Sequence, residues 1–537
     1  MNRRELLKAG SVSAASLWLP GCLDETRQAV DKSADTRPNI VLIMAGDMGF
    51  SDIGCYGGEI STPNIDSLAA GGLRFTHFYN NAICVPTRAS LLTGLYSQQV
   101  GVYANSPKVM KNCVTLAEVL KSAGYRTLMT GKWHALQIPV ERGFDRYYGL
   151  ADGCCNYFNP GPRRPGEPEP GRKRHPGPWP KGQRLFRDAR RWAIDGKVYI
   201  PYQPTEKDFY TTDAFTDYAL KYLDEYSGED RPFFLYIGYT APHYPLHAWP
   251  EDIAKYRGKY MMGWDRLRKQ RYDRLIEMGL IDNRWAMSPR DEIVPRWSDI
   301  QDKDAWDLNM AVYAAMIDRM DQNIGRVLNK IRQLGVEDNT LVLFLSDNGG
   351  CAGIANVTPD IPPGQVESYR SVDPPWANAS NTPFRKYKVW DHEGGISTPL
   401  IAYWPKVIKK GGQMTHQVGH IIDIMATFVD MTGAEYPSAY NGTEVLPMEG
   451  RSLLPIFRGK ESSERDPLFW QIRSNGGGRA VRAGKWKLVT ADPDKPWELY
   501  DMHADRTELH DLADRYRDKA KELARLHDDW INRCKTV

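Results

Sequence analysis

The first candidate for chemistry is Cys84, which opens the stretch CVPTRASLLTG at residues 84–94. Pro86 suits the first turn of a helix, because a proline there loses no N–H bond that the helix needs. A thiol at a helix N-terminus ionises more readily than a free one and can act as a nucleophile. The alternative is a buried, inert cysteine. Neither interpretation explains why Pro86 and Arg88 stand at this spacing.

Two further sets of side chains offer complementary chemistry. Asp47, Asp347 and Asn348 carry hard oxygens, which suit Ca²⁺ or Mg²⁺ rather than zinc. Taken alone, Asp347 and Asn348 followed by two glycines fit a turn after a strand equally well. Other side chains are cationic or can become so: Arg88, Lys132, His134, His243 and Lys388. Cations beside a metal indicate an anionic substrate, either a phosphate or a sulfate.

Five short apolar runs predict strands that place these side chains. They cover residues 40–44, 126–129, 233–237, 340–345 and 399–403. Stretches with helical periodicity separate them, at residues 114–123, 210–226 and 311–334. This alternation predicts an α/β fold with a large, mostly parallel or mixed central sheet flanked by helices. Ligands gather at the carboxyl ends of such strands, so the polar residues that directly follow four of the runs should meet at one edge.

The chain is predicted to divide into a large domain at residues 37–435 and a smaller C-terminal subdomain at residues 436–537. The smaller part contains a hairpin at 480–489, a strand at 497–500 and a charged amphipathic helix at 509–530. These predict a small antiparallel sheet packed with one helix. The stretch 156–191 is dense in Pro, Gly and Arg and predicts a long surface loop.

The first 36 residues predict an export signal and a tether. Residues 2–8 read NRRELLK, a twin-arginine signature, and the apolar run at 9–19 is shorter than the roughly 20 residues that cross a bilayer. This favours a Tat-type signal. Cys22 ends a Leu-Pro-Gly-Cys box similar to a lipoprotein cleavage site, although its proline is unusual, so lipidation stays open. We expect an exported protein, periplasmic or lipid-anchored at the bacterial envelope, with the Tat machinery as partner and membrane contact only through a lipid on Cys22.

Composition excludes other classes of function. A formal net charge of +3 on 537 residues is too small to indicate nucleic acid as a partner. The eight cysteines include no CxxC pair, which argues against a zinc site.

Residues 84–94 closely resemble the signature of the type I sulfatases, which are formylglycine-dependent enzymes with an alkaline phosphatase-like fold. The other family motifs follow in order: PNI at 38–40 leading to DMG at 47–49, GKWH at 131–134, TAPH at 240–243, SDNG at 346–349, Lys388 before EGG at 393–395, WKL at 486–488 and ELYD at 498–501. The resemblance covers about residues 37–515. Residues 256–264 and 381–390 are similar to the bacterial arylsulfatase-like branch.

The resemblance implies a cofactor set and a reaction. Cys84 would be converted to formylglycine by a formylglycine-generating or anaerobic sulfatase-maturating enzyme. Asp47, Asp347, Asn348 and residue 84 would hold Ca²⁺, with Mg²⁺ as an alternative. One oxygen of the hydrated aldehyde, a geminal diol, would attack sulfur, and the other would expel sulfate from the sulfated hemiacetal. The expected substrate is an aryl or carbohydrate sulfate ester, on a small molecule or a glycan.

The same resemblance implies a role for each cation. Arg88 would fix the diol. Lys132, His243 and Lys388 would bind the sulfate oxygens and the bridging oxygen, and His243 or Lys388 would protonate the leaving alcohol. His134 would help deprotonate the second hydroxyl.

The sequence departs from the family pattern at two places. Gly46 stands where the family has a metal-binding aspartate, so we expect a weaker metal site that Gly46→Asp would tighten. Residues 471–475, QIRSN, lack the usual histidine after the Phe-Trp pair. Two alternatives to the sulfatase reaction therefore stay open. One is a phosphonate monoester or phosphodiester hydrolase on the same fold, and the other is a non-catalytic binder of sulfated glycans.

Overall fold

The computed structural model describes residues 36–104, 106–172, 190–474 and 477–535. The described residues from Arg37 onward form one compact unit. The twin-arginine stretch, the apolar run and Cys22 lie outside the described residues, so export and lipidation stay predictions. Within the described part of the chain, no helix is both long and apolar enough to cross a membrane.

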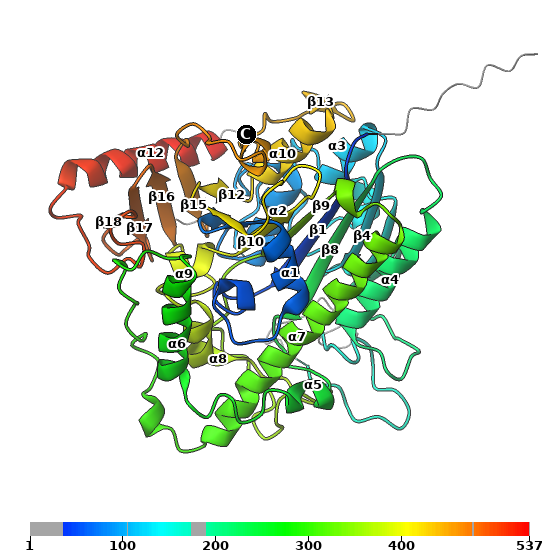
Figure 1. Ribbon diagram of the computed structural model, residues 1–537, viewed down its shortest axis with the longest axis horizontal. Helices are drawn as coiled ribbons and strands as arrows, with labels where there is room; N and C mark the ends of the chain where they lie inside the picture. Colours follow the sequence, from blue (N-terminus) through cyan, green and yellow to red (C-terminus); the bar gives the residue numbers. More distant parts are fainter. Residues whose placement is uncertain (1–35, 105, 173–189, 475–476, 536–537) are drawn as a thin grey trace, which may run out of the picture. The chain divides into compact units, whose positions relative to one another are not determined.

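This unit contains a ten-stranded mixed sheet (Figure 1). In spatial order its strands are β11 (Gln413–Thr415), β2 (Leu73–Phe75), β10 (Leu400–Tyr403), β9 (Thr340–Ser346), β1 (Asn39–Gly46), β8 (Phe233–Pro242), β4 (Arg126–Gly131), β5 (Arg146–Leu150), β6 (Trp192–Ile194) and β7 (Lys197–Tyr199). The central strands β9, β1, β8, β4 and β5 are parallel, while β10, β6 and β7 run antiparallel to their neighbours. All five predicted strands are present, and the predicted α/β sheet is confirmed.

Strand β1 shows how the sheet separates two cores. Ile40, Leu42 and Met44 pack in one core and Val41, Ile43 and Ala45 in the other. An uninterrupted apolar run is typical of a strand buried on both faces. One face is covered by α2 (Cys84–Thr93), α3 (Leu116–Ser122) and α10 (Asp423–Thr432), and the other by α1 (Pro63–Gly71), α4 (Thr211–Glu225) and α7 (Lys303–Gln333).

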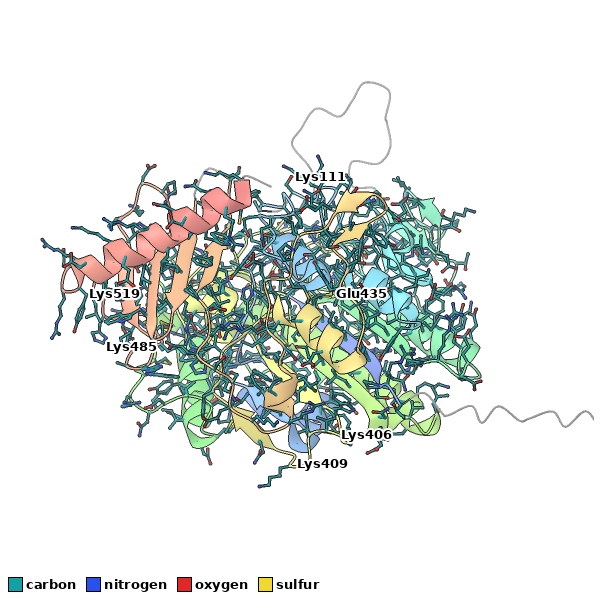
Figure 2. The ribbon with its side chains drawn as sticks, turned by 90° about the horizontal axis from the view of Figure 1, so that it is seen from above. Lys111, Lys406, Lys409, Glu435, Lys485 and Lys519 are labelled. Carbon is teal, nitrogen blue, oxygen red and sulfur yellow. The ribbon has the colours of Figure 1, made fainter. Side chains whose placement is uncertain are left out.

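The remaining elements border this layered core. The short helices are α5 (Pro250–Ala254), α8 (Asp373–Ser380), α9 (Glu393–Ile396) and α11 (Leu454–Phe457), and α6 (Trp264–Glu277) packs against α8. Two-stranded pairs join β3 (Phe78–Tyr79) to β12 (Gly419–His420) and β13 (Ala439–Tyr440) to β14 (Thr443–Glu444). Lysines such as Lys406 and Lys519 project from the surface (Figure 2).

The C-terminal part is an antiparallel sheet of β15 (Leu468–Gln471), β16 (Arg479–Ala483), β17 (Trp486–Thr490) and β18 (Glu498–Asp501), packed against α12 (Arg517–Lys535). Leu488, Leu499 and Leu523 share its small core. The prediction that this helix begins at residue 509 is wrong. Glu508 has a φ of 59°, and its carboxylate lies 2.7 Å from the ammonium of Lys487, so the chain turns there before the helix can start.

Candidate active site

Four neighbouring strands deliver the predicted polar residues to one edge of the sheet. Asp47 follows β1, Asp347 and Asn348 follow β9, Lys132 follows β4 and His243 follows β8. The order β9-β1-β8-β4 makes these strand ends adjacent. The structure therefore brings together residues that are up to 301 positions apart in the chain.

Asp47 lies at the centre of the cluster. Its carboxylate oxygens accept hydrogen bonds from Nζ of Lys388 at 2.7 and 2.8 Å. The amide of Asn348 donates to Oδ1 at 3.0 Å, and Nε2 of His243 lies 3.5 Å from Oδ2. The backbone N–H of Asp47 donates to Asp347 Oδ1 at 3.0 Å. One carboxylate thus joins the β1 and β9 loops to the segment that carries Lys388.

Helix α2 places Cys84 and Arg88 beside this cluster. Cys84 is its first residue and is 2% exposed, and Gly94 ends the helix with a left-handed φ of 69°. All ten side chains of the helix are buried, so it is a central helix rather than an amphipathic surface one. Arg88 donates to Asp347 Oδ2 at 3.1 Å, to the Lys132 carbonyl at 2.9 Å and to the Tyr236 hydroxyl at 2.8 Å. These bonds fix its guanidinium.

The local charges shift several pKa values. Burial raises the pKa of Asp47, but its electrostatic interactions with His243, Lys388 and Lys132 outweigh burial and hold the pKa well below its ordinary value. Burial lowers the pKa of His243 to about 3, although Asp47 opposes this shift. Burial and the nearby Lys132 and Arg88 charges also keep the pKa of His134 well below its ordinary value. Both imidazoles are therefore neutral at neutral pH.

Several buried polar atoms in this site have no hydrogen-bond partner among the described residues. They are Nε of Arg88, Nζ of Lys132, Nδ1 of His134 and Oδ1 of Asn348. Leaving a buried polar group unpaired costs about 1–3 kcal/mol, so each of these atoms is poised for an external partner. The unpaired donors suit the oxygens of an anion, and the unpaired oxygen of Asn348 suits a cation.

The residues fit a hard divalent cation in donor chemistry. Asp47, Asp347 and Asn348 contact one another and supply carboxylate and amide oxygens. Only two of the three are acidic, and no group of three or more His, Cys, Asp or Glu in the described ranges has metal-cluster geometry. Gly46 contributes no ligand.

The structure also changes the expectation for Gly46. A Cβ built on Gly46 would lie 2.7 Å from the backbone carbonyl oxygen of Thr240. That oxygen belongs to β8 and cannot move like a flexible side chain. Gly46→Asp therefore requires a shift of the backbone near Thr240 before an added carboxylate can bind a metal, and the gain in metal affinity stays a prediction.

Backbone strain also concentrates in this region. Asp47 has a φ of 65°, His134 of 63° and Val389, directly after Lys388, of 75°. Such conformations are costly for residues with a Cβ, especially a β-branched one, and tend to persist at functional sites. Gly153 relieves crowding beside His134, because a Cβ there would lie 2.5 Å from the imidazole.

Sequence reasoning missed three side chains that support the site. Tyr236 lies inside the apolar run of β8, where only its hydroxyl distinguishes it from a core residue. The hydroxyl of Tyr157 donates to the His243 carbonyl at 2.7 Å from the loop predicted at 156–191, of which residues 173–189 lie outside the described ranges. Burial raises the pKa of the Cys351 thiol to about 12, and Lys388 and Asp47 lie close enough to modify it. Cys351 stands two residues after Gly349, so its nearness to the predicted metal-binding segment is visible in the sequence.

The loop that departs from the family pattern also reaches this region. Gln471 and Ile472 line a narrow gap together with Ile83, Pro86 and Asp391. The N–H of Ala104 donates to the Ile472 carbonyl at 2.7 Å. The segment after β15 therefore packs against the start of α2, while Arg473 is exposed.

Comparisons with known proteins agree with this geometry. The chain matches the Sulfatase family over residues 38–434 and the N-sulphoglucosamine sulphohydrolase C-terminal family over residues 384–533. An uncharacterized sulfatase of Schizosaccharomyces pombe is 31% identical, covering 92% of this chain and 94% of that protein. The arylsulfatase of Klebsiella aerogenes is 30% identical, covering 86% and 99% respectively.

A solved structure is also similar in its fold. The crystal structure of Ps i-CgsB in complex with k-i-k-neocarrahexaose has a TM-score of 0.67 and 26% identity, covering 92% of this chain and 93% of that one. The family match spans more than half of the chain. The chain therefore belongs to the sulfatase family of sulfate ester hydrolases, within the alkaline phosphatase-like superfamily.

Proposed function

We propose that this sulfatase cleaves aryl or carbohydrate sulfate esters with a formylglycine made from Cys84 and a hard divalent cation, Ca²⁺ or Mg²⁺, held by Asp47, Asp347 and Asn348. The observation that carries the proposal is the position of Cys84. Its side chain is buried at the first residue of α2, close enough to Arg88 and Lys388 to influence the charge of both. An ordinary core cysteine does not need two buried cations beside it.

The buried donors without a hydrogen-bond partner among the described residues would bind the sulfate group. Lys132 is fully buried, and the carboxylate nearest to its Nζ, Asp347 Oδ2, is 3.6 Å away. Arg88 is held by three hydrogen bonds, so it enters the reaction already oriented. Fixed donors in a water-poor pocket stabilise developing negative charge without reorganisation. When bound, the cation would add positive charge to the same site, and the hydrated formylglycine would supply two oxygens on one carbon.

Hydrogen bonds support a role for each proton-transfer residue. Nδ1 of His243 lies 2.6 Å from the carbonyl oxygen of Tyr244, which can only accept, so Nδ1 carries the proton. The neutral ring then presents an unprotonated Nε2, and the ammonium of Lys388 is the better donor to the leaving alcohol. His134 is half-buried, with Nδ1 unpartnered among the described residues, and can accept the proton of the second hydroxyl.

The relatives indicate the range of substrates to test. The Klebsiella aerogenes relative is an arylsulfatase, and the Ps i-CgsB complex holds a neocarrahexaose. We therefore propose an assay of aryl sulfate, sulfated monosaccharides and sulfated oligosaccharides beside aryl phosphonate and phosphodiester substrates. Sulfate release at a rate well above phosphonate cleavage supports the proposal, and the reverse ranking contradicts it.

The covalent modification has its own test. Conversion of the thiol of Cys84 to an aldehyde lowers the mass of the peptide that contains residue 84. Protein produced with a maturating enzyme should show this lower mass and should lose activity on chelation of divalent cations. An unmodified Cys84 under these conditions favours the non-catalytic binder of sulfated glycans, which Gly46 keeps open.

We also propose export through the Tat machinery to the periplasm or the envelope. Arg3 and Arg4 and the apolar run at residues 9–19 support this. Replacing both arginines by lysine should retain the protein in the cytoplasm. Cys22→Ala should release an envelope-bound protein into the soluble fraction if Cys22 carries a lipid.

A further inference from the structure

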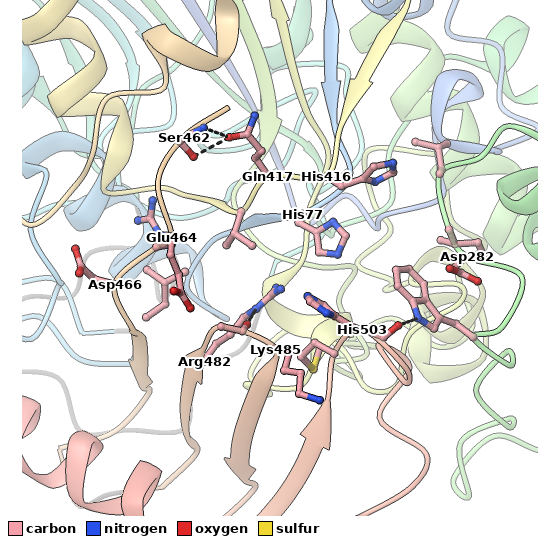
Figure 3. Close-up of a pocket in the computed structure, with 18 of the residues that line it drawn as sticks. His77, Asp282, His416, Gln417, Ser462, Glu464, Asp466, Arg482, Lys485 and His503 are labelled. Carbon is pink, nitrogen blue, oxygen red and sulfur yellow. Dashed lines mark hydrogen bonds between the residues drawn. The ribbon is translucent and has the colours of Figure 1, made fainter. Parts of the chain in front are cut away.

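A second cavity lies apart from the active-site residues. It encloses about 920 Å³ between the loop after α6, the β11–β12 connection and the ends of β16 and β17 (Figure 3). Its lining contains none of the active-site residues named above. A volume of this size is typical of sites for small organic ligands.

The sheet places this cavity at its functional edge. His77 follows β2 by two residues, and His416 directly follows β11. Phe75 of β2 pairs with Leu400, which pairs with Leu345 of β9, so β2 ends at the same edge as β9 and β1. Three strand steps separate β2 from β1, a distance of about 14 Å at ordinary strand spacing. The cavity is therefore a different crevice on the edge where ligands of such sheets bind.

Two histidines of the lining contact the same hydroxyl group. The Thr76 hydroxyl contacts Nδ1 of His77 at 2.8 Å, Nδ1 of His416 at 2.9 Å and the Thr415 carbonyl at 3.1 Å. The hydroxyl has one proton, and a carbonyl can only accept it. The hydroxyl can therefore donate to only one of its three contacts, and the Thr415 carbonyl already accepts from the Thr76 N–H at 3.0 Å. A hydroxyl that donates to Nδ1 of His77 leaves the Nε2–H of that ring as a donor for another partner. Figure 3 shows His77 and His503 pointing toward the same space as Arg482.

The floor of the cavity is cationic. His77 and Arg482 are 7% and 5% exposed, and no carboxylate is among the buried residues of the lining. Arg506 lies behind His77, where its guanidinium donates to the Thr76 carbonyl at 2.7 Å. Burial and the charges of Arg506 and Arg482 lower the pKa of His77 well below its ordinary value. Arg482 is thus the buried cation of the lining, whereas Arg506 behind His77 is paired with Glu393 at 3.0 Å.

The acidic residues of the lining lie at its mouth. Asp282 pairs with Arg284 at 2.6 Å, and Asp466 pairs with Arg451. Glu464 is exposed. Lys485 reaches the surface at the same mouth (Figure 2). Apolar side chains complete the inner wall: Leu280, Ile281, Trp285, Leu468 and Met502. The cavity combines an apolar wall and a polar mouth with a positively charged floor.

We propose that this cavity is an accessory site for an organic oxyanion, a ring-shaped body that carries one sulfate or carboxylate group. The anionic group would accept from the Nε2–H of His77 and lie against His503 and Arg482, and the ring would lie against Trp285. A single oxyanion avoids the acidic mouth better than a polyanionic chain would. The site acts by binding alone and does not depend on hydrolysis at residue 84.

The test is calorimetric titration of full-length Cys84→Ala protein, which cannot turn over, with galactose 6-sulfate, galactose and inorganic sulfate. Galactose 6-sulfate should bind at a site that His77→Asn weakens about tenfold or more, because the variant keeps an amide that can bond to Thr76 but loses Nε2. The His503→Ala variant should weaken the same site, and His503 is exposed, so its removal leaves the fold intact. The matched control is His510→Asn, which changes a largely exposed histidine outside the cavity lining.

Each result decides the proposal or its ligand. Equal binding of galactose and galactose 6-sulfate at a His77-dependent site overturns the requirement for an oxyanion. Failure of all three probes to show a His77-dependent site overturns the proposal. Comparable affinity for inorganic sulfate and the sulfated sugar overturns the requirement for a ring-shaped body. These outcomes are independent of whether the active site hydrolyses sulfate esters.

Discussion

Two buried clusters of charged side chains differ in how completely the charges are paired. The clusters come close to each other in sequence at Lys388 and Glu393. The active-site cluster gathers Arg88, Lys132 and Lys388 around Asp47 and Asp347. The Glu393 cluster, defined here as Glu393, Glu508, Lys487 and Arg506, joins α9 to the C-terminal part. All four side chains of the Glu393 cluster are fully buried.

The pairing within each cluster differs in kind. Lys487 lies 2.9 Å from Glu393 and 2.7 Å from Glu508, and Arg506 lies 3.0 Å from Glu393, so two cations balance two carboxylates. Arg506 also donates to the Thr76 carbonyl and the Ser397 hydroxyl, both at 2.7 Å. The active-site cluster instead has three buried cations for two carboxylates and leaves donors unpaired.

The difference in pairing indicates a structural role for one cluster and a binding role for the other. The Glu393 cluster is complete, so it fixes the segment that begins at Lys388 to the C-terminal part. The active-site cluster is incomplete, so it holds unpaired donors ready for a substrate anion. A buried charge that lacks its partners is costly to the fold, and that cost is expected where binding supplies the missing partner.

The largest expected effect is on activity alone. Cys84→Ala removes the only atom that can become the nucleophile in the proposed reaction, so kcat/KM should fall by about 10⁴-fold or more. The thermal unfolding midpoint should change little, because a small buried side chain is replaced by a slightly smaller one. Steady-state kinetics on an aryl sulfate and a thermal melt check both. Substantial residual sulfatase activity would remove Cys84 from the mechanism.

The complete cluster should show the opposite behaviour. Lys487→Met leaves Glu393 and Glu508 buried with one cation between them, so the free energy of unfolding should fall by about 3–5 kcal/mol. Urea unfolding measures this. The matched control is Lys485→Met, which breaks a pair with Asp501 at a 46% exposed lysine and should cost about 1 kcal/mol or less. Equal losses in the two variants would contradict the role given to the Glu393 cluster.

Sequence reasoning recovered the parts of the site that obey simple rules. Asp47, Asp347 and His243 were predicted to meet because each follows a strand of a parallel sheet, and the structure places them in contact through Asp47. Lys388 follows no strand of the central four. It was named as a candidate cation, but its role was predicted through the family resemblance, because its position depends on the loop before α9. The functional roles of all these residues stay predictions.

The rest of the molecule depends on pairings that a single sequence does not display. Tyr236 reads as one more apolar residue of β8, yet its hydroxyl accepts from Arg88. The turn at Glu508 overrides the helical periodicity of residues 509–516, because a buried lysine far away in sequence holds its carboxylate. The cavity beside His77 arises from segments near residues 77, 285, 416, 482 and 503, which no local pattern connects.

A Lys→Met substitution in the active-site cluster should affect the free energy of unfolding differently from Lys487→Met. Lys132 and Lys487 are both fully buried, but Nζ of Lys132 has no hydrogen-bond partner among the described residues. Lys132→Met should therefore leave the free energy of unfolding unchanged or raise it by about 1 kcal/mol, while kcat/KM falls by about 10²–10³-fold. Urea unfolding of the apo-protein beside kinetics separates the two effects. A loss of stability as large as that of Lys487→Met would show that the active-site cluster is also a structural one.

The smallest expected effect belongs to Asp391, which lies between the two clusters in sequence. Its side chain is 2% exposed, and neither carboxylate oxygen has a hydrogen-bond partner among the described residues. Burial raises its pKa to about 7, although the charge of Lys487 opposes the shift. A folded-state pKa above the unfolded value means that the stability this group contributes is present at low pH and is lost as pH rises through 7.

Wild-type protein should therefore lose roughly 2.5 kcal/mol of this contribution between pH 5 and pH 8, and Asp391→Asn should not. The measurement is the difference between the unfolding free energies of the two proteins across that range, which cancels every other titrating group. Parallel curves would mean that Asp391 has an ionic partner in the folded protein. Unfolding free-energy curves that converge toward low pH would show that Asp391 is an unpaired acid next to the Glu393 cluster. The protein would then tolerate an unpaired acid there, just as it tolerates unpaired basic groups in the active site.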